Sequence, residues 1–171
     1  MKRLVLVIGP NGTGKSTACK ALIEHLPMSA YIDSDYCRYM NPFSFTSEEI
    51  DVVVSNITTI MINYFRLSTI KNIIFPYGFH GVRKQIFDRI LNRLDESNIS
   101  YALCPILLEC SLEENISRMQ KDGRDAERIL SAIQKTREIY HQYNYPRLDT
   151  TYLTPEETAE AMVRILDLLK E

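Results

Sequence analysis

Short apolar runs alternate with longer segments of helical periodicity along this chain of 171 residues. Residues 4–8 form a continuous apolar run, which is typical of a strand buried on both faces of a sheet. Four further strands are predicted at residues 30–32, 72–76, 100–108 and 150–153. Pro105 suits the fourth of them badly unless the strand bulges there. Strands that alternate with helices predict an α/β fold, in which a parallel sheet carries helices on both faces.

Apolar residues recur at helical spacing in the segments between the predicted strands. The longest of these segments predicts a helix that begins near Ser47, without a complete capping box, and ends near Ser68. Ser111 and Glu114 have the spacing of a capping box for a later helix. The clearest helix start is at Thr154, which is followed directly by proline and, three positions on, by glutamate.

Glycine is rare, with six in the chain, yet three of them fall within six consecutive positions after the first predicted strand. Residues 9–16 read Gly-Pro-Asn-Gly-Thr-Gly-Lys-Ser and match G-x-x-x-x-G-K-[ST], between a strand and a helix as that motif requires. Such glycines let main-chain N–H groups point at phosphate oxygens, where the helix dipole adds positive potential. The residues predicted to bind nucleotide phosphates are Gly9, Asn11, Gly12, Thr13, Gly14, Lys15, Ser16 and Thr17.

Two side chains of this loop have a more specific predicted role. Lys15 would reach the β- and γ-phosphates of ATP, and the Ser16 hydroxyl would ligate Mg²⁺. The same loop occurs in GTPases, ATPases and kinases, so the rest of the chain must discriminate. The sequence contains no Asn-Lys-x-Asp tetrad for guanine, and the strand at residues 72–76 does not end in an acidic residue. Both observations favour a kinase.

An acidic motif, Asp33-Ser34-Asp35-Tyr36-Cys37-Arg38, follows the second predicted strand. This is the carboxyl edge of the sheet, where open α/β folds bind their ligands. We predict that Asp35 orients the attacking hydroxyl and accepts its proton, and that Asp33 holds the Mg²⁺ shell. Arg38 could clamp an anionic group of the substrate or neutralise charge on the phosphoryl group during transfer.

Three arginines, Arg118, Arg124 and Arg128, surround the helix break at residues 122–125. A helical hairpin of this kind, approximately residues 118–128, could close over the phosphates as a lid. Phosphoryl transfer needs both neutralisation of charge and exclusion of water, and mobile arginines supply them. We predict a catalytic role for Arg124, and leave Arg128 open between such a role and a solvated helix face.

Charge and composition bear on nucleic-acid binding, on cellular location and on the state of the cysteines. The net charge is −2, so no overall basic field would attract nucleic acid. No apolar run reaches the length of a membrane span, and the chain is predicted to be cytoplasmic. The four cysteines lack C-x-x-C or zinc-like spacing, which predicts buried free thiols.

These motifs together resemble the nucleoside- and nucleotide-kinase-like branch of P-loop kinases, a group that includes adenylate, shikimate, gluconate and polynucleotide 5′-hydroxyl kinases. The resemblance rests on the loop at residues 9–16, the acidic motif, Arg118, Arg124 and the Asp-Thr-Thr at residues 149–151. It implies a five-stranded parallel sheet in the order 2-3-1-4-5, Mg-ATP as donor and a closing lid. It also implies that Arg118 and the loop from Arg147 to Pro155 border the adenine, and that residues 1–171 form a single P-loop kinase domain.

The acceptor is left open by the sequence. Arg83 is a candidate contact for an anionic substrate group, and aromatic residues near both acidic and glycine turns are candidates for a pocket or for core packing. The members of that aromatic set are Tyr36, Tyr39, Phe43, Phe45, Tyr77, Phe79 and His80. The leading hypothesis is transfer of the γ-phosphoryl to a small hydroxyl compound.

Three alternatives remain beside that hypothesis. The first is a nucleoside monophosphate kinase, with the acceptor phosphate held by Arg38 and Arg83. The second is a nucleotide-binding or slow ATPase module that acts through a partner. The third is a kinase whose acceptor is a polynucleotide 5′-hydroxyl. The net charge makes this acceptor less favourable without excluding it. The sequence allows a monomer or a homodimer.

Overall fold

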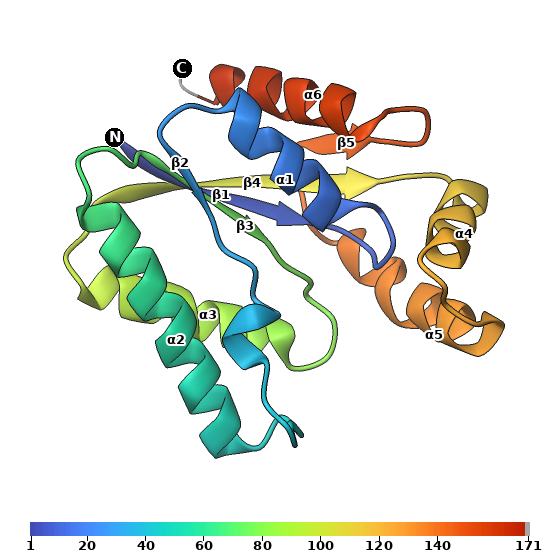
Figure 1. Cartoon of the computed structure of the whole chain (residues 1–171), viewed down its shortest axis with the longest axis horizontal. Helices are drawn as coiled ribbons and strands as arrows, with labels where there is room; N and C mark the ends of the chain where they lie inside the picture. The colour runs from blue at the N-terminus through green and yellow to red at the C-terminus, as the bar shows by residue number, and fades with distance from the viewer. Residues whose placement is uncertain (170–171) are drawn as a thin grey trace.

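The computed structural model describes residues 1–169, in which five parallel strands form one sheet in the order β2-β3-β1-β4-β5 (Figure 1). The strands are β1 (Lys2–Ile8), β2 (Ser29–Tyr31), β3 (Asn72–Pro76), β4 (Tyr101–Glu109) and β5 (Arg147–Asp149). The order and the parallel pairing confirm the predicted α/β fold. The glycine loop follows β1, the central strand, so it opens at the carboxyl edge of the sheet.

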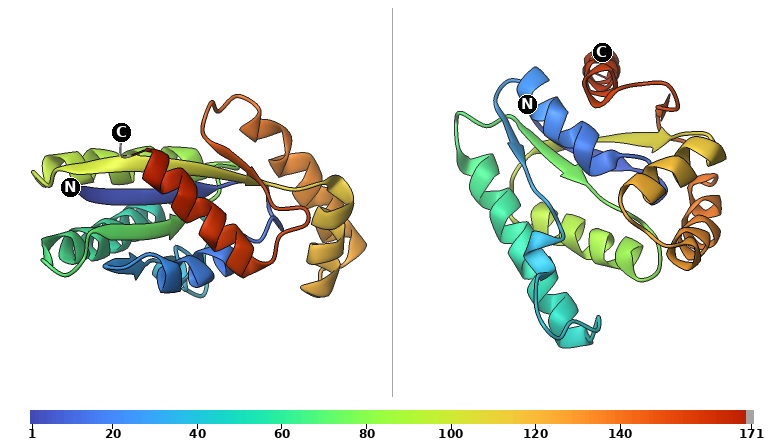
Figure 2. Two further views of the ribbon diagram at one scale, coloured as in Figure 1. Left: turned by 90° about the horizontal axis from the view of Figure 1, so that it is seen from above. Right: turned by 45° about the vertical axis from the view of Figure 1, so that its right-hand side comes forward.

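Helices cover both faces of this sheet, as Figure 2 shows, and make it the middle of three layers. The helices are α1 (Lys15–His25), α2 (Ser47–Arg66), α3 (Arg83–Glu96), α4 (Leu112–Lys121), α5 (Ala126–Thr136) and α6 (Pro155–Leu168). Helices α1 and α6 pack on one face, and α2 and α3 pack on the other. Helices α4 and α5 lie beyond the carboxyl end of β4 (Figure 1).

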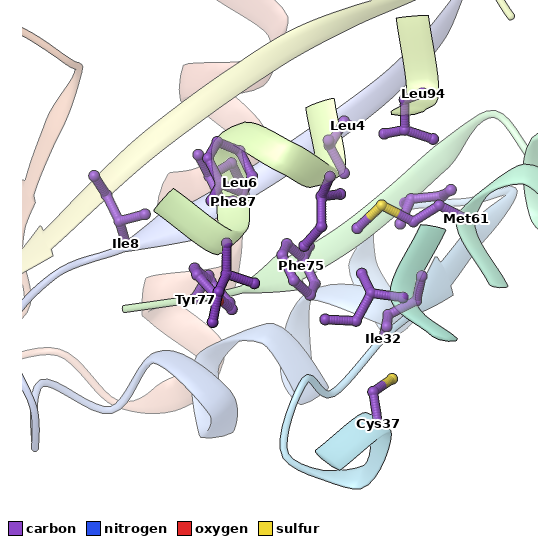
Figure 3. Packing of buried hydrophobic residues seen from close by; sticks show 14 of the residues in the cluster. Leu4, Leu6, Ile8, Ile32, Cys37, Met61, Phe75, Tyr77, Phe87 and Leu94 are labelled. Atoms are coloured by element: carbon purple, nitrogen blue, oxygen red, sulfur yellow. The ribbon is translucent and has the colours of Figure 1, made fainter. Parts of the chain in front are cut away.

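The central strand divides its side chains between two cores. Leu4, Leu6 and Ile8 join the core beneath α2 and α3, where they meet Phe75 and Phe87 (Figure 3). Val5 and Val7 join the core beneath α1 and α6. These five of the seven β1 side chains are completely buried, and burial of each stabilises the fold by about 1.5–3 kcal/mol. The site loop therefore follows directly from a strand whose last five side chains are fully buried.

The prediction that Pro105 would force a bulge is wrong. Pro105 lies in regular register opposite Leu6 of β1. The N–H of Leu107 points toward β5, where it donates to the Pro146 carbonyl, so the nitrogen of Pro105, two positions earlier, faces the same side. There β5 has not yet begun, and proline therefore costs no ladder hydrogen bond.

Three local predictions are corrected by the structure. The cap of α2 is Thr46, one residue earlier than predicted, and with Glu49 it forms a complete capping box where none was predicted. The helix ends at Arg66 rather than near Ser68. The fifth strand is Arg147–Asp149 and not residues 150–153, because those residues turn toward α6.

The cap of α4 is also simpler than expected. The Ser111 hydroxyl accepts from the Glu114 N–H, but the Glu114 carboxylate binds Arg118 instead of returning to the cap. By contrast, Thr154 and Glu157 form the predicted full capping box at the start of α6. The four cysteines are free and buried, as predicted.

Candidate functional site

The glycine loop wraps around the start of α1 with three glycines at positive φ. Gly12 and Gly14 lie in the left-handed region at φ +81° and +86°, and Gly9 has φ +147°. A Cβ atom on Gly12 would lie 2.4 Å from Met119 Cγ, and one on Gly9 would lie 2.2 Å from the Leu108 carbonyl oxygen. These positions therefore need glycine both for backbone conformation and for space.

Lys15 lies across this loop. Its ammonium donates hydrogen bonds to the main-chain oxygens of Gly9, at 2.9 Å, and Pro10, at 2.7 Å. Burial, together with the neighbouring charges of Arg83 and Arg124, lowers the pKa of Lys15 to about 8. A phosphate placed in the loop would offset both effects, because it supplies the negative charge that the folded chain leaves unmatched.

A group of residues that sequence patterns did not reveal holds the loop from behind. Asn115 of α4 is completely buried, and its Nδ2 donates to the Asn11 carbonyl at 2.9 Å. The hydroxyl of Thr136 in α5 accepts from the Asn11 N–H at 3.1 Å. Arg137 in turn donates to the Asn115 side-chain oxygen. The loop conformation thus depends on two helices that follow it by more than 100 residues.

A cavity of about 220 Å³ opens above the loop at the carboxyl edge of the sheet, and we call it the loop cavity. Its wall brings together predicted site residues from four separate segments: Asn11, Gly12, Gly14, Lys15, Ser16, Thr17, Asp33, Asp35, Arg83 and Arg124. The predicted site residues outside this wall are Gly9, Thr13, Arg38 and Arg118. Most of the residues predicted for phosphate, metal and acceptor chemistry therefore meet in one place.

The acidic motif is ordered by its own hydrogen bonds. One oxygen of Asp33 accepts from the Asp35 N–H at 2.9 Å, and the other accepts from the Tyr31 hydroxyl at 3.2 Å. Asp35 is exposed, and its Oδ1 accepts both hydrogen bonds from Arg38. Within residues 1–169, Oδ2 of Asp35 has no hydrogen-bond partner, so it is available to a ligand.

Arg38 and Arg83 approach the same aromatic ring from different elements. The guanidinium carbon of Arg38 is 5.7 Å from the Phe45 ring centre, and that of Arg83 is 6.0 Å from it. Arg83 forms no ion pair with any described carboxylate. Burial, followed by the charge of Arg38, lowers the pKa of Arg83 from its ordinary value. An unpaired guanidinium on the cavity wall is a ready anion contact.

Arg118 lines a second cavity, of about 420 Å³, which lies between α1, α4 and α6. We call it the α4–α6 cavity. The guanidinium donates to the carbonyls of Thr13 and Thr150 and pairs with Glu114 at 2.8 Å. Leu153 and Pro155 line the same cavity. Arg118 thus joins the glycine loop to the segment after β5.

The turn between α4 and α5 carries Arg124 into the loop cavity. Arg124 is half-buried and lies 3.7 Å from the carboxylate of Asp122. The predicted lid range covers the end of α4, this turn and the beginning of α5. Arg128 is exposed on α5 and faces a different cavity, which it shares with Arg124.

The members of the predicted aromatic set lie in different environments. Tyr77 and Phe79 are buried in the core, and Tyr77 also lines the loop cavity. Phe43 and Phe45 are partly buried against that core, whereas Tyr36 and Tyr39 are largely exposed. His80 lines the loop cavity, and its Nδ1 is buried without a hydrogen-bond partner in the described chain. Burial lowers the pKa of His80 to about 4, helped by the charges of Arg83 and Lys15, so its imidazole is neutral at physiological pH.

The oxygen ligands on the cavity wall suit Mg²⁺. Ser16 offers a hydroxyl and Asp33 a carboxylate, and this ion typically takes one or two protein oxygens while keeping several waters. No group of three His, Cys, Asp or Glu residues in positions 1–169 has the arrangement of an all-protein metal site. The donor set therefore fits magnesium held jointly with a phosphate ligand.

Comparison with known proteins agrees with this architecture. A family model described as "AAA domain" matches residues 5–141, most of the chain and all of the loop cavity. The chain belongs to the AAA domain family. A search of curated proteins found no match to this member of the family.

The similarity to solved structures covers nearly the whole chain, beyond the residues that the family model matches. The chain is 18% identical to the tunicamycin resistance protein of Deinococcus radiodurans, with a TM-score of 0.62 over 99% of this chain and 96% of that one. It is 16% identical to a gluconokinase from Sinorhizobium meliloti 1021, with a TM-score of 0.59 over 97% and 93%. A shikimate kinase from Aquifex aeolicus has a TM-score of 0.59 at 14% identity, over 98% of each chain. This member of the AAA domain family therefore has a P-loop kinase-like fold.

No helix in the described part of the chain has both the length and the apolar character required to cross a bilayer.

Proposed function

We propose that this protein is a Mg-ATP-dependent kinase that transfers the γ-phosphoryl group to a hydroxyl of a small acceptor. The observation that carries the proposal is the convergence of Lys15, Ser16, Asp33, Asp35 and Arg124 on one cavity above the glycine loop. A phosphate cradle alone fits many nucleotide-binding proteins. A carboxylate with a free oxygen in the same cavity is what a phosphoryl transfer to a hydroxyl needs.

ATP would lie across the two cavities that meet at the loop. The loop N–H groups and Lys15 would hold the β- and γ-phosphates. The α4–α6 cavity, with Arg118 and the segment to Pro155, would hold the base. Four residues of the glycine loop, α1 and the turn after α4 line both cavities: Gly12, Gly14, Thr17 and Asp122. One extended nucleotide can therefore span them.

Ser16 and Asp33 would hold the magnesium ion, directly or through water. When bound there, the ion would supply positive charge against the negative charge that develops during transfer. The hydrogen bonds of Asp33 to Tyr31 and to the Asp35 N–H fix the direction of its carboxylate. Ordering of this kind is the usual role of a second layer of partners around a metal ligand.

Asp35 would act as the base. Its Oδ2, which has no partner within residues 1–169, accepts the proton of the acceptor hydroxyl while Oδ1 remains paired with Arg38. The acceptor oxygen then forms its bond to the γ-phosphorus as the bond between that phosphorus and the β–γ bridging oxygen breaks. The products are ADP and a phosphorylated acceptor.

Arg124 would neutralise charge on the phosphoryl group during transfer, and the turn that carries it would serve as the lid. The lid would belong to the same single domain, proposed to span residues 1–171. The contact of Arg124 with Asp122 at 3.7 Å is long for an ion pair, so the guanidinium is free to move to a phosphate. Closure of residues 118–128 would also remove water, which otherwise competes with the hydroxyl as acceptor.

Arg83, supported by Arg38, would bind an anionic group of the acceptor. A nucleoside monophosphate kinase is the alternative that this pair favours, because Arg83 lines the cavity without a carboxylate partner. In that reaction the acceptor is already an anion and needs no base. Replacement of Asp35 would then reduce turnover less than replacement of Arg38.

The test is ADP release, measured over a panel of hydroxyl compounds and nucleoside monophosphates, for the natural protein and Asp35→Asn. We expect acceptor-dependent turnover that falls by about 10²–10⁴-fold in the variant, with ATP affinity unchanged. Asp51→Asn, which alters an exposed carboxylate of α2 paired with Arg89, is the matched control. Acceptor-independent hydrolysis that survives Asp35→Asn would instead indicate a slow ATPase module.

A further inference from the structure

A third cavity, of about 400 Å³, lies along α5 and we call it the α5 groove. Its wall includes Arg124, Arg128 and Lys135 from the turn and the helix, together with Asn11 of the glycine loop and His80 from the segment after β3. The function proposed above gives no ligand contact to Arg128 or Lys135.

The three cavities follow one another in a row. The loop cavity shares Asp122 and three residues of the glycine loop and α1 with the α4–α6 cavity. It shares a different set, Asn11, His80 and Arg124, with the α5 groove. The α4–α6 cavity and the α5 groove have no residue in common. The groove therefore adjoins the loop cavity and not the proposed base site.

The groove carries positive charge that the described chain does not neutralise. Arg128 and Lys135 have no ion pair and no side-chain hydrogen bond within residues 1–169, although Glu127 lies on the same wall. The two cations are seven positions apart on α5, so about 10 Å of helix separates them. The wall offers no tyrosine, phenylalanine or tryptophan on which a base could stack.

His80 marks the passage between the loop cavity and the groove. It lines both, and its buried Nδ1 has no hydrogen-bond partner in the described chain. Because its imidazole is neutral, the ring can accept or donate one hydrogen bond without adding charge. A buried polar atom without a partner is uncommon in folded proteins, and here it sits where a ligand would pass.

We propose that the α5 groove binds a phosphate group of the acceptor, remote from the hydroxyl that reacts at Asp35, through Arg128 and Lys135 with His80 at the passage. The proposal rests on the kinase function proposed above and specifies its substrate class as a phosphorylated alcohol. A phosphorylated metabolite and the backbone of an oligonucleotide with a free 5′-hydroxyl present the same chemistry to the groove.

The experiment uses the full chain saturated with Mg-AMP-PNP, so that the loop and base cavities are filled before the groove is probed. Binding of AMP-PNP itself is measured first. If it fails, the proposed kinase function fails independently of the groove. Ribose 5-phosphate and ribose are then titrated calorimetrically, and a 3′-fluorescein hexathymidylate with a free 5′-hydroxyl is titrated by anisotropy at several salt concentrations.

The probes are compared in the natural protein, in Arg128→Gln/Lys135→Gln and in the surface control Arg164→Gln on α6. Saturable binding of ribose 5-phosphate, at least about tenfold tighter than ribose and lost in the double variant, supports a phosphorylated small acceptor. Binding of hexathymidylate alone, with a salt slope that falls by about 1.4 in the double variant, supports an oligonucleotide. If no phosphate-bearing probe binds, or if the double variant binds as well as the natural protein, the proposal is overturned.

Discussion

The Nδ2 atom of Asn115 donates a 2.9 Å hydrogen bond to the main-chain oxygen of Asn11, near the tip of the glycine loop. Asn115 belongs to α4, and its side chain is completely buried. Its oxygen accepts from Arg137, whose guanidinium also donates to the Cys110 carbonyl. The helical hairpin of α4 and α5 is thereby attached to the loop whose shape decides phosphate binding.

Asn115→Ala should destabilise the protein and weaken ATP binding together. The substitution removes the hydrogen bonds of Asn115 to the half-buried Asn11 carbonyl and to one N–H of Arg137, and each such bond contributes about 1 kcal/mol. Urea unfolding measures the first effect and calorimetric titration with Mg-ATP the second. Asn92→Ala, at an exposed position of α3, should change neither. Equal effects of the two substitutions would contradict the role given to Asn115.

Gly12→Ala should be far more costly than Gly123→Ala. Both glycines have positive φ, at +81° and +75°, so both substitutions incur the backbone cost of about 1–2 kcal/mol. Only at Gly12 would the new methyl overlap Met119 and Asn115, whereas nothing lies within 4 Å at Gly123. We expect about 1–3 kcal/mol of additional destabilisation from that overlap.

Urea unfolding of Gly12→Ala and Gly123→Ala measures the loss of stability in each variant, and ATP affinity is measured for both. Gly123→Ala should retain ATP binding, because its methyl would face open space. A loss of stability that is the same in both variants would show that the close approach of α4 to the loop is not a constraint.

ATP affinity should fall as the pH rises above about 8. The pKa of Lys15 is lowered to about 8 by burial, so the ammonium that faces the phosphates is lost above that pH in the free protein. Binding above pH 8 should therefore take up a proton, which calorimetry in buffers of different ionisation enthalpy detects. An affinity that stays constant from pH 7 to pH 10 would contradict this assignment.

The lowered pKa of Lys15 affects folding stability in the opposite direction: as the pH rises, ATP affinity falls but stability increases. Since the pKa of Lys15 is about 8 when folded and 10.5 when unfolded, the unfolded chain binds more protons between these values. The free energy of unfolding therefore gains a contribution from Lys15 as the pH rises through that window. Bound ATP should abolish the gain, because it restores the charged form.

Arg118→Lys should weaken ATP binding by about tenfold, despite the retained charge. The guanidinium makes hydrogen bonds to Thr13, Thr150 and Glu114 at once, and an ammonium cannot reproduce that planar arrangement. Arg164→Lys on the exposed face of α6 is the control. Unchanged affinity in Arg118→Lys would mean that the α4–α6 cavity does not receive the base.

Local patterns predicted much of the fold because the features involved are local. A run such as residues 4–8 is apolar at every position because β1 is buried on both faces. The strand Arg147–Asp149 escaped prediction because it is a short edge strand with two exposed residues and no apolar run. The Thr46 cap was missed by one position, within the usual uncertainty of a helix boundary.

The amino-acid pattern was sufficient for the glycine loop, the acidic motif and the alternation of strands and helices, since each depends on neighbouring residues. Folding decided which of the predicted arginines share a cavity: Arg83 and Arg124 line the loop cavity, while Arg38 and Arg118 do not. It also decided that Asn115 and Thr136 hold the loop. Each bonds to Asn11 from a position 104 or 125 residues later, and a hydrogen bond between such distant residues leaves no periodicity or spacing in the chain.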